Sequence, residues 1–492
     1  MIFDLGPSYT GNRALRQATL SADVQKMKIL VVIANYGTKN DQYLQRLLEE
    51  YRSMSFDVHI VVLSDIPKGL GDRVEVIVET PQGDPWSFPF AHKRILAEQC
   101  DDYDLFIYSE DDTLITQRNI EAFLRVTEVL PENEIAGFIR SEQRPDGTIN
   151  FSTVHAHFHW DPRSVVSRGQ YTFAFFTNQH SGSYLLTRSQ LTRAVQSGGF
   201  LVGPHQGRYH LPETAATDPY TQCGFKKMIC ISHIDDFVLP HLPNKYVGKL
   251  GLQAMEIFRQ IEALLSIRGG RRPSTVLLSS ETKLGGAMWS KSYYEPASPA
   301  VLALIPSGVR SVLSYGCGWG AMEAELIKRG IRVTAVALDS VIGACAEARG
   351  VDVIYGDSEG VPSKLSGERF DCILLSNVLH LVALPEKLLV SLTRLVATGG
   401  VVVATVPNLA QLPITWRRMA RHAAFRNLTS YEQAGTHLTS DRVVRRWFVN
   451  AGLRVRKRIS VIPHRAEWFH RASGSLLDSL LAEEFSVLGS KT

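Results

Sequence analysis

The N-terminal half of the chain alternates short apolar runs with amphipathic stretches. Apolar runs of strand length occur in MKILVVIANYG (27–37), DVHIVVLSD (57–65) and LFIYSEDD (105–112). Between them, DQYLQRLLEEYRSM and FAHKRILAEQC carry apolar residues at helical spacing. This alternation predicts a mainly parallel sheet with helices on its faces.

The pattern changes between residues 251 and 287. QAMEIFRQIEALLSI predicts a helix, and RGGRRPS after it has the composition of an exposed connection. A second series of apolar runs and helices follows: RSVLSYGCGWG, the helix AMEAELIKRG, IRVTAVALD, a helix through AEARG, VDVIYGD, FDCILLSNVLHLV and GGVVVATVPN. We therefore predict an α/β chain made of an N-terminal extension (1–26), a first domain (27–250), a helix and linker (251–287) and a second domain (288–492).

The composition is that of an ordinary globular protein. Of the 492 residues, 45% are hydrophobic and 21% charged, and a net charge of +4 is too small to indicate a nucleic-acid partner. The six cysteines form no C-x-x-C pair, which argues against a zinc knuckle or a disulfide framework. The polar N-terminal stretch, and the lack of an apolar run of about 18 residues, predict a cytoplasmic protein.

Arginine is concentrated between Trp416 and Arg471, in WRRMARHAAFR, RVVRRWF and RVRKR. One interpretation is a solvated basic surface. The other is a patch that faces anionic lipid or a phosphate-bearing acceptor, which would give the protein a peripheral contact with a membrane.

Three acids, Glu110, Asp111 and Asp112, come directly after a buried run. In open α/β sheets, ligands bind at the C-terminal ends of strands. Adjacent carboxylates repel one another, so a cation or a basic cluster is expected to hold them ionised. A divalent ion such as Mn²⁺ or Mg²⁺ would also bridge the oxygens of a diphosphate leaving group.

This acid motif and its flanks resemble the Asp-x-Asp motif of nucleotide-sugar-dependent glycosyltransferases of the GT-A fold. The resemblance implies that Glu110 and Asp112 bind a divalent metal and that the donor is a nucleotide sugar. It also implies that a histidine after the last core strand completes the metal shell. His233 is the preferred candidate and His241 the second.

The order of HSGSYLLTRSQLTRAVQSGG (180–199) and PETAATDPYTQCGFKKMICISH resembles fringe-like members of that fold. In this comparison Asp218 takes the place of the catalytic base, with Glu213 as the neighbouring candidate. Such a base accepts the proton of the acceptor hydroxyl in an inverting transfer. The structural alternative is that Asp218 caps a helix beginning at Pro219.

Further residues of the first half are candidates for binding donor or acceptor. In VHAHFHW, His155, His157 and His159 alternate, so on a strand they would share one face and line an acceptor groove with Trp160. For the donor, the candidates are Asp65 at the end of the second strand and Lys93 and Arg94 on a helix. The two cations could neutralise phosphate, or they could be ordinary surface charges.

The run VLSYGCGWG (312–320) resembles the first motif of class I S-adenosylmethionine-dependent methyltransferases. Glycine allows a tight turn and a close approach of the backbone to a cofactor. The resemblance extends over residues 288–460 and implies the cofactor-binding residues Gly316, Cys317, Gly318, Gly320 and Asp357. It also implies a base for methyl transfer, for which the candidate is His380; its structural alternative is a packed histidine.

Two positions depart from the pattern of that family. Ser314 stands where an acid is usual, and Ala337 stands where a carboxylate normally binds the ribose hydroxyls. Asp339, two residues later, is the residue that could compensate. Loss of such a charge-assisted contact would cost on the order of a few kcal/mol of cofactor binding.

Together these patterns predict a bifunctional enzyme. The first domain would transfer a sugar from a nucleotide sugar to a saccharide or lipid-linked glycan in a metal-dependent reaction. The second would methylate the same glycan, a pairing that suits polysaccharide or glycolipid assembly. In one alternative the second domain is a non-catalytic scaffold or binding module, and in a lower-ranked one the first domain is a sugar nucleotidyltransferase.

Overall fold

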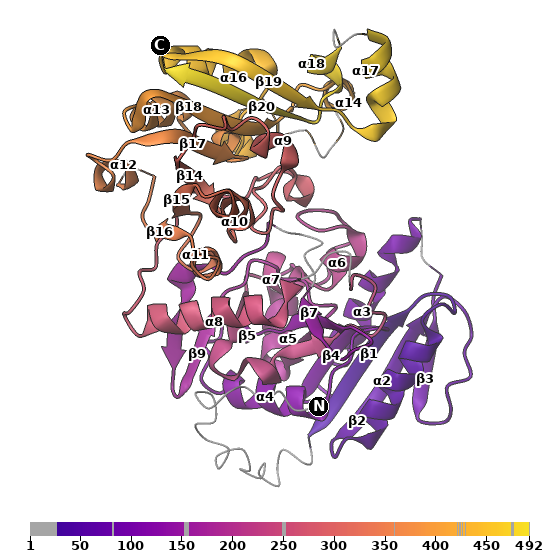
Figure 1. Cartoon of the computed structure of the whole chain (residues 1–492). Coiled ribbons are helices and arrows are strands. Elements are labelled where there is room, and N and C mark those ends of the chain that lie inside the picture. Colours follow the sequence, from indigo (N-terminus) through magenta and orange to yellow (C-terminus); the bar gives the residue numbers. More distant parts are fainter. Residues whose placement is uncertain are drawn as a thin grey trace.

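A computed structural model describes residues 27–80, 83–151, 157–247, 252–358, 360–420, 422, 425, 427–428, 430–473 and 477–491. The N-terminal extension (1–26) and His155 lie outside the described residues. Figure 1 shows the N-terminal half, in indigo to magenta, packed against a C-terminal half in orange and yellow.

A five-stranded sheet of order β10-β4-β1-β2-β3 forms the centre of the N-terminal half. Its parallel strands are β1 (Lys28–Asn35), β2 (Asp57–Ser64), β3 (Val74–Val78) and β4 (Leu105–Glu110). The strand β10 (Ser183–Thr187) is antiparallel to β4 and closes the edge. The apolar runs that predicted β1, β2 and β4 are largely buried because both faces of the sheet are covered, whereas β3 is only partly buried.

The helices of this half follow the predicted amphipathic stretches. The longer ones are α2 (Asp41–Ser53), α3 (His92–Glu98), α4 (Gln117–Thr127) and α5 (Arg188–Gln196). The helices α4 and α5 both begin with a capping box, formed at Thr116 and Thr187. Shorter segments are η2 (Pro85–Ala91), η3 (Pro162–Ser164), α6 (Leu211–Ala215), α7 (Asp218–Thr221) and η4 (Ile231–Asp236).

Two four-stranded sheets complete the N-terminal half. One has the order β5-β11-β9-β8, with β5 (Glu134–Ala136), β11 (Lys226–Cys230), β9 (Tyr171–Ala174) and β8 (Val166–Arg168). The other has the order β12-β6-β7-β13, with β12 (Val238–Pro240), β6 (Ile139–Gln143), β7 (Ile149–Phe151) and β13 (Leu252–Gln253). Because β13 pairs with β7, the first two described residues of the predicted linker belong to an N-terminal sheet.

The predicted helix of the linker is present as α8 (Ala254–Arg268) and lies at the junction of the two halves. Its buried residues Ile257 and Ile261 belong to the core of the N-terminal half. On its other side, Glu256 accepts hydrogen bonds from Arg349 in the C-terminal half at 3.1 Å. After the helix, Arg272 pairs with Glu347 at 2.7 Å, so the connection predicted to be exposed is anchored.

The C-terminal half is built on a seven-stranded sheet of order β16-β15-β14-β17-β18-β20-β19. Its strands are β14 (Ser311–Cys317), β15 (Arg332–Ala337), β16 (Asp352–Ile354), β17 (Phe370–Ser376), β18 (Val396–Pro407), β19 (Leu453–Val461) and β20 (Glu484–Lys491). The first five run parallel, and β20 is antiparallel to both of its neighbours, β18 and β19. This is the predicted Rossmann-like α/β architecture, whereas the GT-A fold of the N-terminal half stays a prediction.

The C-terminal helices lie on the faces and edges of this sheet (Figure 1). They are η5 (Gly285–Ala287), α9 (Pro299–Leu302), α10 (Ala321–Lys328), α11 (Ile342–Glu347), α12 (Val361–Lys364), η6 (Leu379–Leu381), α13 (Pro385–Thr393), α14 (Leu412–Met419), α15 (Tyr431–Ala434), α16 (Asp441–Asn450), η8 (His464–Ala466), α17 (Glu467–Ser473) and α18 (Asp478–Leu481). Within the described ranges no helix has the length and apolar character needed to cross a bilayer.

Candidate functional site

The three carboxylates that follow β4 have different partners within the protein. Asp111 is buried, and its two oxygens accept hydrogen bonds from Asn35 Nδ2 and Asn40 Nδ2, both at 2.7 Å. Asn35 ends β1 and Asn40 directly precedes α2, so neighbouring elements of the sheet hold this side chain. Burial raises the pKa of Asp111 to about 6.

Glu110 lies between two basic side chains. Its carboxylate oxygens are 3.4 Å from Arg140 Nη1 and 3.6 Å from His180 Nε2. Burial raises the pKa of Glu110 to about 8, because the attraction of Arg140 does not offset burial and the repulsion of neighbouring acids. Burial thus favours the protonated form of Glu110, which lessens the repulsion among the three adjacent acids.

Asp112 faces His241, which stands between two carboxylates. His241 Nε2 is 3.4 Å from Asp112 Oδ2, and its Nδ1 is 2.7 Å from Glu142 Oε1. Burial acts to raise the pKa of Asp112, but the hydrogen bond and charge of His241 and the charge of Arg140 outweigh it, so the pKa is lowered. Asp112 is thus the acid of the triplet whose ionised form the protein favours most.

The predicted metal ligands do not fit a divalent ion in this arrangement. Glu110, Asp111 and Asp112 each use protein partners, and the described residues contain no group of three or more His, Cys, Asp or Glu side chains placed to hold a metal. The preferred histidine, His233, is exposed on η4 beside Ser232, whereas the second candidate, His241, reaches the acid motif. Amides, a guanidinium and an imidazole therefore offset the charge repulsion that suggested a cation.

A cavity of about 310 Å³ lies next to the acid triplet. Its walls are mostly aromatic and aliphatic, with a few polar groups, and comprise Ile139, Arg140, Phe151, Phe158, Trp160, Phe176, Asn178, His180, Tyr209, His210, Glu213, Tyr246, Leu252, Ile257 and Tyr294. Arg140 and His180 connect the cavity to Glu110. Apolar walls with a few convergent polar groups are typical of small-molecule sites.

Glu213 is the acid that faces this cavity. It lies on α6, and its Oε2 is buried with no hydrogen-bond partner among the described residues. A buried oxygen without a partner is costly unless a ligand or water satisfies it. Trp160 lines the cavity, whereas His159 stacks on Tyr293, and the acceptor groove stays a prediction.

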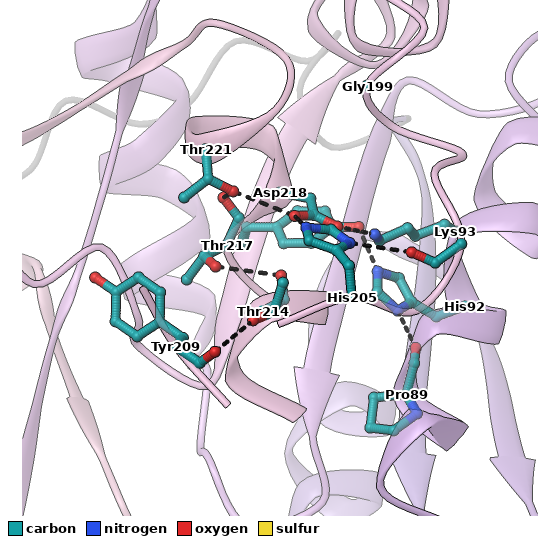
Figure 2. A network of polar contacts seen from close by, with 12 residues as sticks. Pro89, His92, Lys93, Gly199, His205, Tyr209, Thr214, Thr217, Asp218 and Thr221 are labelled. Carbon is teal, nitrogen blue, oxygen red and sulfur yellow. Dashed lines mark hydrogen bonds and ion pairs between the residues drawn. The ribbon is translucent and has the colours of Figure 1, made fainter. Parts of the chain in front are cut away.

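Asp218, the first candidate for the base, belongs to a buried ion pair (Figure 2). Its carboxylate is fully buried and pairs with Lys93, which is 2% exposed. His205 Nε2 lies 3.4 Å from Asp218 Oδ1, and Thr221 Oγ1 donates a hydrogen bond to the same oxygen at 3.2 Å. Glu213 lines the cavity, whereas Asp218 is absent from its walls.

The three predicted donor-binding residues do not converge. Asp65 follows β2 and accepts a hydrogen bond from Gly37 N at 2.7 Å. Lys93 is buried against Asp218, and Arg94 is exposed and pairs with Glu79 at 3.0 Å. Only Asp65 therefore lies at a strand end of the central sheet, where a nucleotide was expected.

In the C-terminal half, the predicted glycine turn joins β14 to α10. Gly316 and Gly320 have φ values of +85° and +89°, which residues with a β-carbon rarely adopt. A Cβ on Gly318 would lie 2.4 Å from the carbonyl oxygen of Tyr293, so this glycine is required by the chain itself. Cys317 is buried within the turn, and burial raises the pKa of its thiol.

The two departures from the methyltransferase pattern are accommodated differently. Ser314 Oγ donates a hydrogen bond of 2.5 Å to Glu323 Oε1, so the first turn of α10 supplies the carboxylate that position 314 lacks. Asp339 Oδ1 accepts from Val341 N and Ile342 N at 2.7 and 2.8 Å, at the start of α11. Its Oδ2 is buried with no hydrogen-bond partner among the described residues, and its role in place of the acid missing at Ala337 stays a prediction.

The segment before β14 brings further polar residues to the turn, and sequence reasoning missed them. Glu295 pairs with the buried Lys291, and its backbone oxygen accepts from Trp319 Nε1 at 2.7 Å. Asn377 Nδ2 donates to Glu295 Oε1 at 3.3 Å and to Glu484 Oε2 at 3.1 Å. The available signals were the acid in SYYEP and the polar residue that follows β17.

His380 and Asp357 lie around the same edge of the sheet. His380 is buried on η6, its Nε2 donates to the Trp289 carbonyl at 2.8 Å, and burial lowers its pKa to about 4. Asp357 is exposed after β16 and accepts a hydrogen bond from Gly360 N at 2.7 Å. His380 is therefore neutral at pH 7 and packed, as in the structural alternative.

Comparison with known proteins bears on the C-terminal half. A family model described as a methyltransferase domain matches residues 288–458. Uncharacterized methyltransferases of Mycobacterium bovis and Mycobacterium tuberculosis are 30% identical over 112 residues, which is 22% of this chain. The chain spans 57% of the length of these relatives.

Solved structures similar to the chain include two SAM-dependent methyltransferases. The one from Thermotoga maritima is 21% identical, with 39% of this chain and 86% of that chain covered and a TM-score of 0.30. The one from Archaeoglobus fulgidus is 14% identical, with 38% and 87% covered and a TM-score of 0.30. These comparisons give the glycosyltransferase resemblance no support, and the matched family model supports a methyltransferase domain in the C-terminal part of the chain.

Proposed function

We propose that the C-terminal domain transfers a methyl group from S-adenosylmethionine. The observation that carries this proposal is the glycine turn between β14 and α10, which lies within the matched residues 288–458 and faces the polar residues Glu295 and Asn377. The backbone of the turn and these two side chains would hold the cofactor. When bound, S-adenosylmethionine supplies an electrophilic methyl group.

The carboxylates around Asn377 suit the proton transfer that methylation of a hydroxyl requires. Glu484 begins β20, and burial raises its pKa, with a further contribution from Glu295. A carboxylate of raised pKa is a stronger base, so Glu484 can accept the hydroxyl proton. His380 is a poorer candidate because its low pKa weakens it as a base.

Titration calorimetry of the full chain with S-adenosylmethionine tests this function. We expect saturable binding, and we expect Asn377→Gly to weaken it about tenfold through loss of the amide contact. Glycine suits the φ of +49° at this position, so the turn is retained. The matched control is Glu368→Gln at an exposed site. Absence of heat at millimolar cofactor would overturn methyl transfer in favour of a scaffold or binding module.

A second candidate function is sugar transfer in the N-terminal half. It is supported by the cavity of about 310 Å³, where aromatic walls suit a sugar ring and Glu213 offers a buried oxygen without a partner. Glu213 would take the proton of an acceptor hydroxyl. Tyr294 of the segment before β14 also lines the cavity, so both halves would act on one glycan.

Incubation with a panel of nucleotide sugars, with and without a chelator, tests the second candidate. We expect release of sugar that the chelator does not change, because the residues present do not fit a metal. Glu213→Gln should lower the rate by about 10²-fold, as for loss of a general base. Glu132→Gln, whose side chain is 96% exposed, should have no effect. If no nucleotide sugar is cleaved, this function is wrong.

A further inference from the structure

We propose that the face of the C-terminal half formed by α14 docks onto an anionic lipid membrane. The helix α14 has the sequence LPITWRRM, and its exposed apolar residues are Leu412, Trp416 and Met419. They recur at i, i+4 and i+7, so they share one side of the helix. We call these three residues the α14 stripe.

The α14 stripe is unusual because it faces solvent. Leu412, Trp416 and Met419 are 55%, 68% and 79% exposed. Ile414, on the opposite side of the helix, is buried in a small cluster that includes Leu409. The helix therefore uses one side for packing and leaves a wide apolar side uncovered, whereas a surface helix normally presents polar residues there.

The positive charge next to the α14 stripe indicates an anionic partner. Arg417 and Arg418 lie in the last turn of α14, and the helix has no acidic residue. Within the described part of the chain, neither arginine forms an ion pair with an acidic side chain. Tryptophan with neighbouring arginines is typical of a helix that lies in a lipid interface, where the aromatic ring enters the headgroup layer and the guanidinium groups meet phosphate.

A second exposed aromatic residue occurs at the same end of the C-terminal half. Trp468 on α17 is 71% exposed, and Leu480 on α18 is 43% exposed. Asn408, just before α14, donates hydrogen bonds to Ser479 O and Ala482 O at 3.0 and 2.9 Å, which ties α18 to the start of α14. Figure 1 shows α14, α17 and α18 at this end.

The position of the stripe relates it to the methyltransferase edge of the sheet. The helix α14 follows β18, and β18 runs parallel to β14 and β17. The C-terminal ends of these strands, and with them the glycine turn and Asn377, therefore lie at the edge from which α14 begins. A docked stripe would bring this edge close to the lipid surface. Access to a lipid-linked acceptor would rest on the proposed methyl transfer, but membrane binding does not depend on it.

Vesicle flotation of the full chain tests the proposal. With vesicles of phosphatidylcholine and phosphatidylglycerol we expect the protein to float, and high salt should reduce binding because surface charges are screened. Vesicles of phosphatidylcholine alone should bind it about tenfold more weakly. Equal binding to both, or no flotation with either, would overturn an anionic membrane as the partner.

Variants test whether vesicle binding depends on the α14 stripe or on non-specific adsorption of exposed apolar residues. Trp416→Ala should lower vesicle binding about tenfold, and Arg417→Gln with Arg418→Gln should lower it only on anionic vesicles. Trp86 on η2 is also 68% exposed, so Trp86→Ala is the matched control and should bind as the natural chain does. Equal losses for Trp86→Ala and Trp416→Ala would contradict the assignment.

Two further measurements test whether the α14 stripe is exposed in the folded protein and whether a second copy of the chain covers it. Unchanged thermal unfolding of Trp416→Ala is expected because the side chain is exposed, and a large decrease in Tm would refute the claim that the stripe is uncovered. Sedimentation velocity of the free protein should give a monomer over a wide concentration range. Self-association that Trp416→Ala abolishes would instead make a second copy of the chain the occupant of the stripe.

Discussion

The imidazole of His159 lies flat against the ring of Tyr293, with centroids 4.3 Å apart and planes 4° apart. His159 belongs to the N-terminal half, and Tyr293 belongs to the segment before β14. The carbonyl oxygen of Tyr293 accepts a hydrogen bond of 3.0 Å from Trp319 N in the glycine turn. The next residue, Tyr294, lines the N-terminal cavity. The two candidate sites therefore share one short segment of backbone.

Replacing His159 should affect the distant glycine turn. We expect His159→Ala to lower the free energy of unfolding by about 1 kcal/mol through loss of the stacked pair. We also expect it to weaken S-adenosylmethionine binding several-fold, because Tyr293 supports the turn. Chemical denaturation and calorimetry measure the two effects. His464→Ala, at a side chain that is 96% exposed, is the control, and unaltered cofactor affinity in His159→Ala would contradict the link.

Lys93 and Asp218 provide a test of whether Asp218 is structural. Asp218→Asn leaves a buried ammonium group without its counter-ion, so we expect a loss of about 3–5 kcal/mol in the free energy of unfolding. The double variant Lys93→Met, Asp218→Leu should recover most of that stability, since no buried charge remains. A base that acts only in catalysis would give the opposite result, with Asp218→Asn as stable as the natural protein but inactive.

The acid triplet predicts how stability depends on pH. The pKa of Glu110 is raised to about 8 and that of Asp111 to about 6, so the folded protein holds these protons more tightly than the unfolded chain. Their contribution is fully present below the unfolded values and is lost as the pH rises through the folded ones. Unfolding free energy should therefore fall between about pH 4.5 and pH 8. Glu110→Gln should flatten this slope, and an unchanged slope would show that Glu110 is ionised in the fold.

Glu323 accepts a hydrogen bond from Ser314, and a swap tests whether it takes the place of the acid missing at position 314. Ser314→Asp places a second carboxylate beside Glu323 in a buried site, so we expect a loss of about 3 kcal/mol in stability. Adding Glu323→Ser restores a single carboxylate and should restore stability and cofactor binding together. If Ser314→Asp alone is as stable as the natural chain, the hydrogen bond between Ser314 and Glu323 is not the reason for the departure. Denaturant midpoints measured at pH 7 decide between these outcomes.

Local pattern predicted much of the fold. The apolar runs at 28–35 and 311–317 form β1 and β14, and the glycine turn falls at the residues expected. These features depend on residues that are close together in the sequence, so the spacing of apolar residues predicts them. The pairing of Lys93 with Asp218 joins residues 125 positions apart, and no local pattern reports that separation. The sequence therefore suggested a catalytic base for Asp218 and a phosphate contact for Lys93, whereas in the fold the two side chains pair with each other.

The same distinction applies to the site residues: contacts with nearby residues could be predicted, and contacts with residues distant in the sequence could not. His233 and His241 both follow late strands, so the sequence could not tell which one reaches Asp112. Asp339 stands three residues before the start of α11, a local signal for the hydrogen bonds that it accepts from the backbone there. The contact of Glu323 with Ser314 was not predicted for a different reason. The family pattern places the acid at position 314 and says nothing of the first turn of α10, which faces it.

The close approach of Gly318 to the Tyr293 carbonyl also limits what the glycine triplet indicates about function. A β-carbon there would collide with the main chain whether or not a cofactor is ever present. Selection for folding alone is therefore enough to preserve Gly318, even in a descendant that has abandoned methylation. In surveys of genomes, this glycine would mark shared ancestry of the domain and not its catalytic competence.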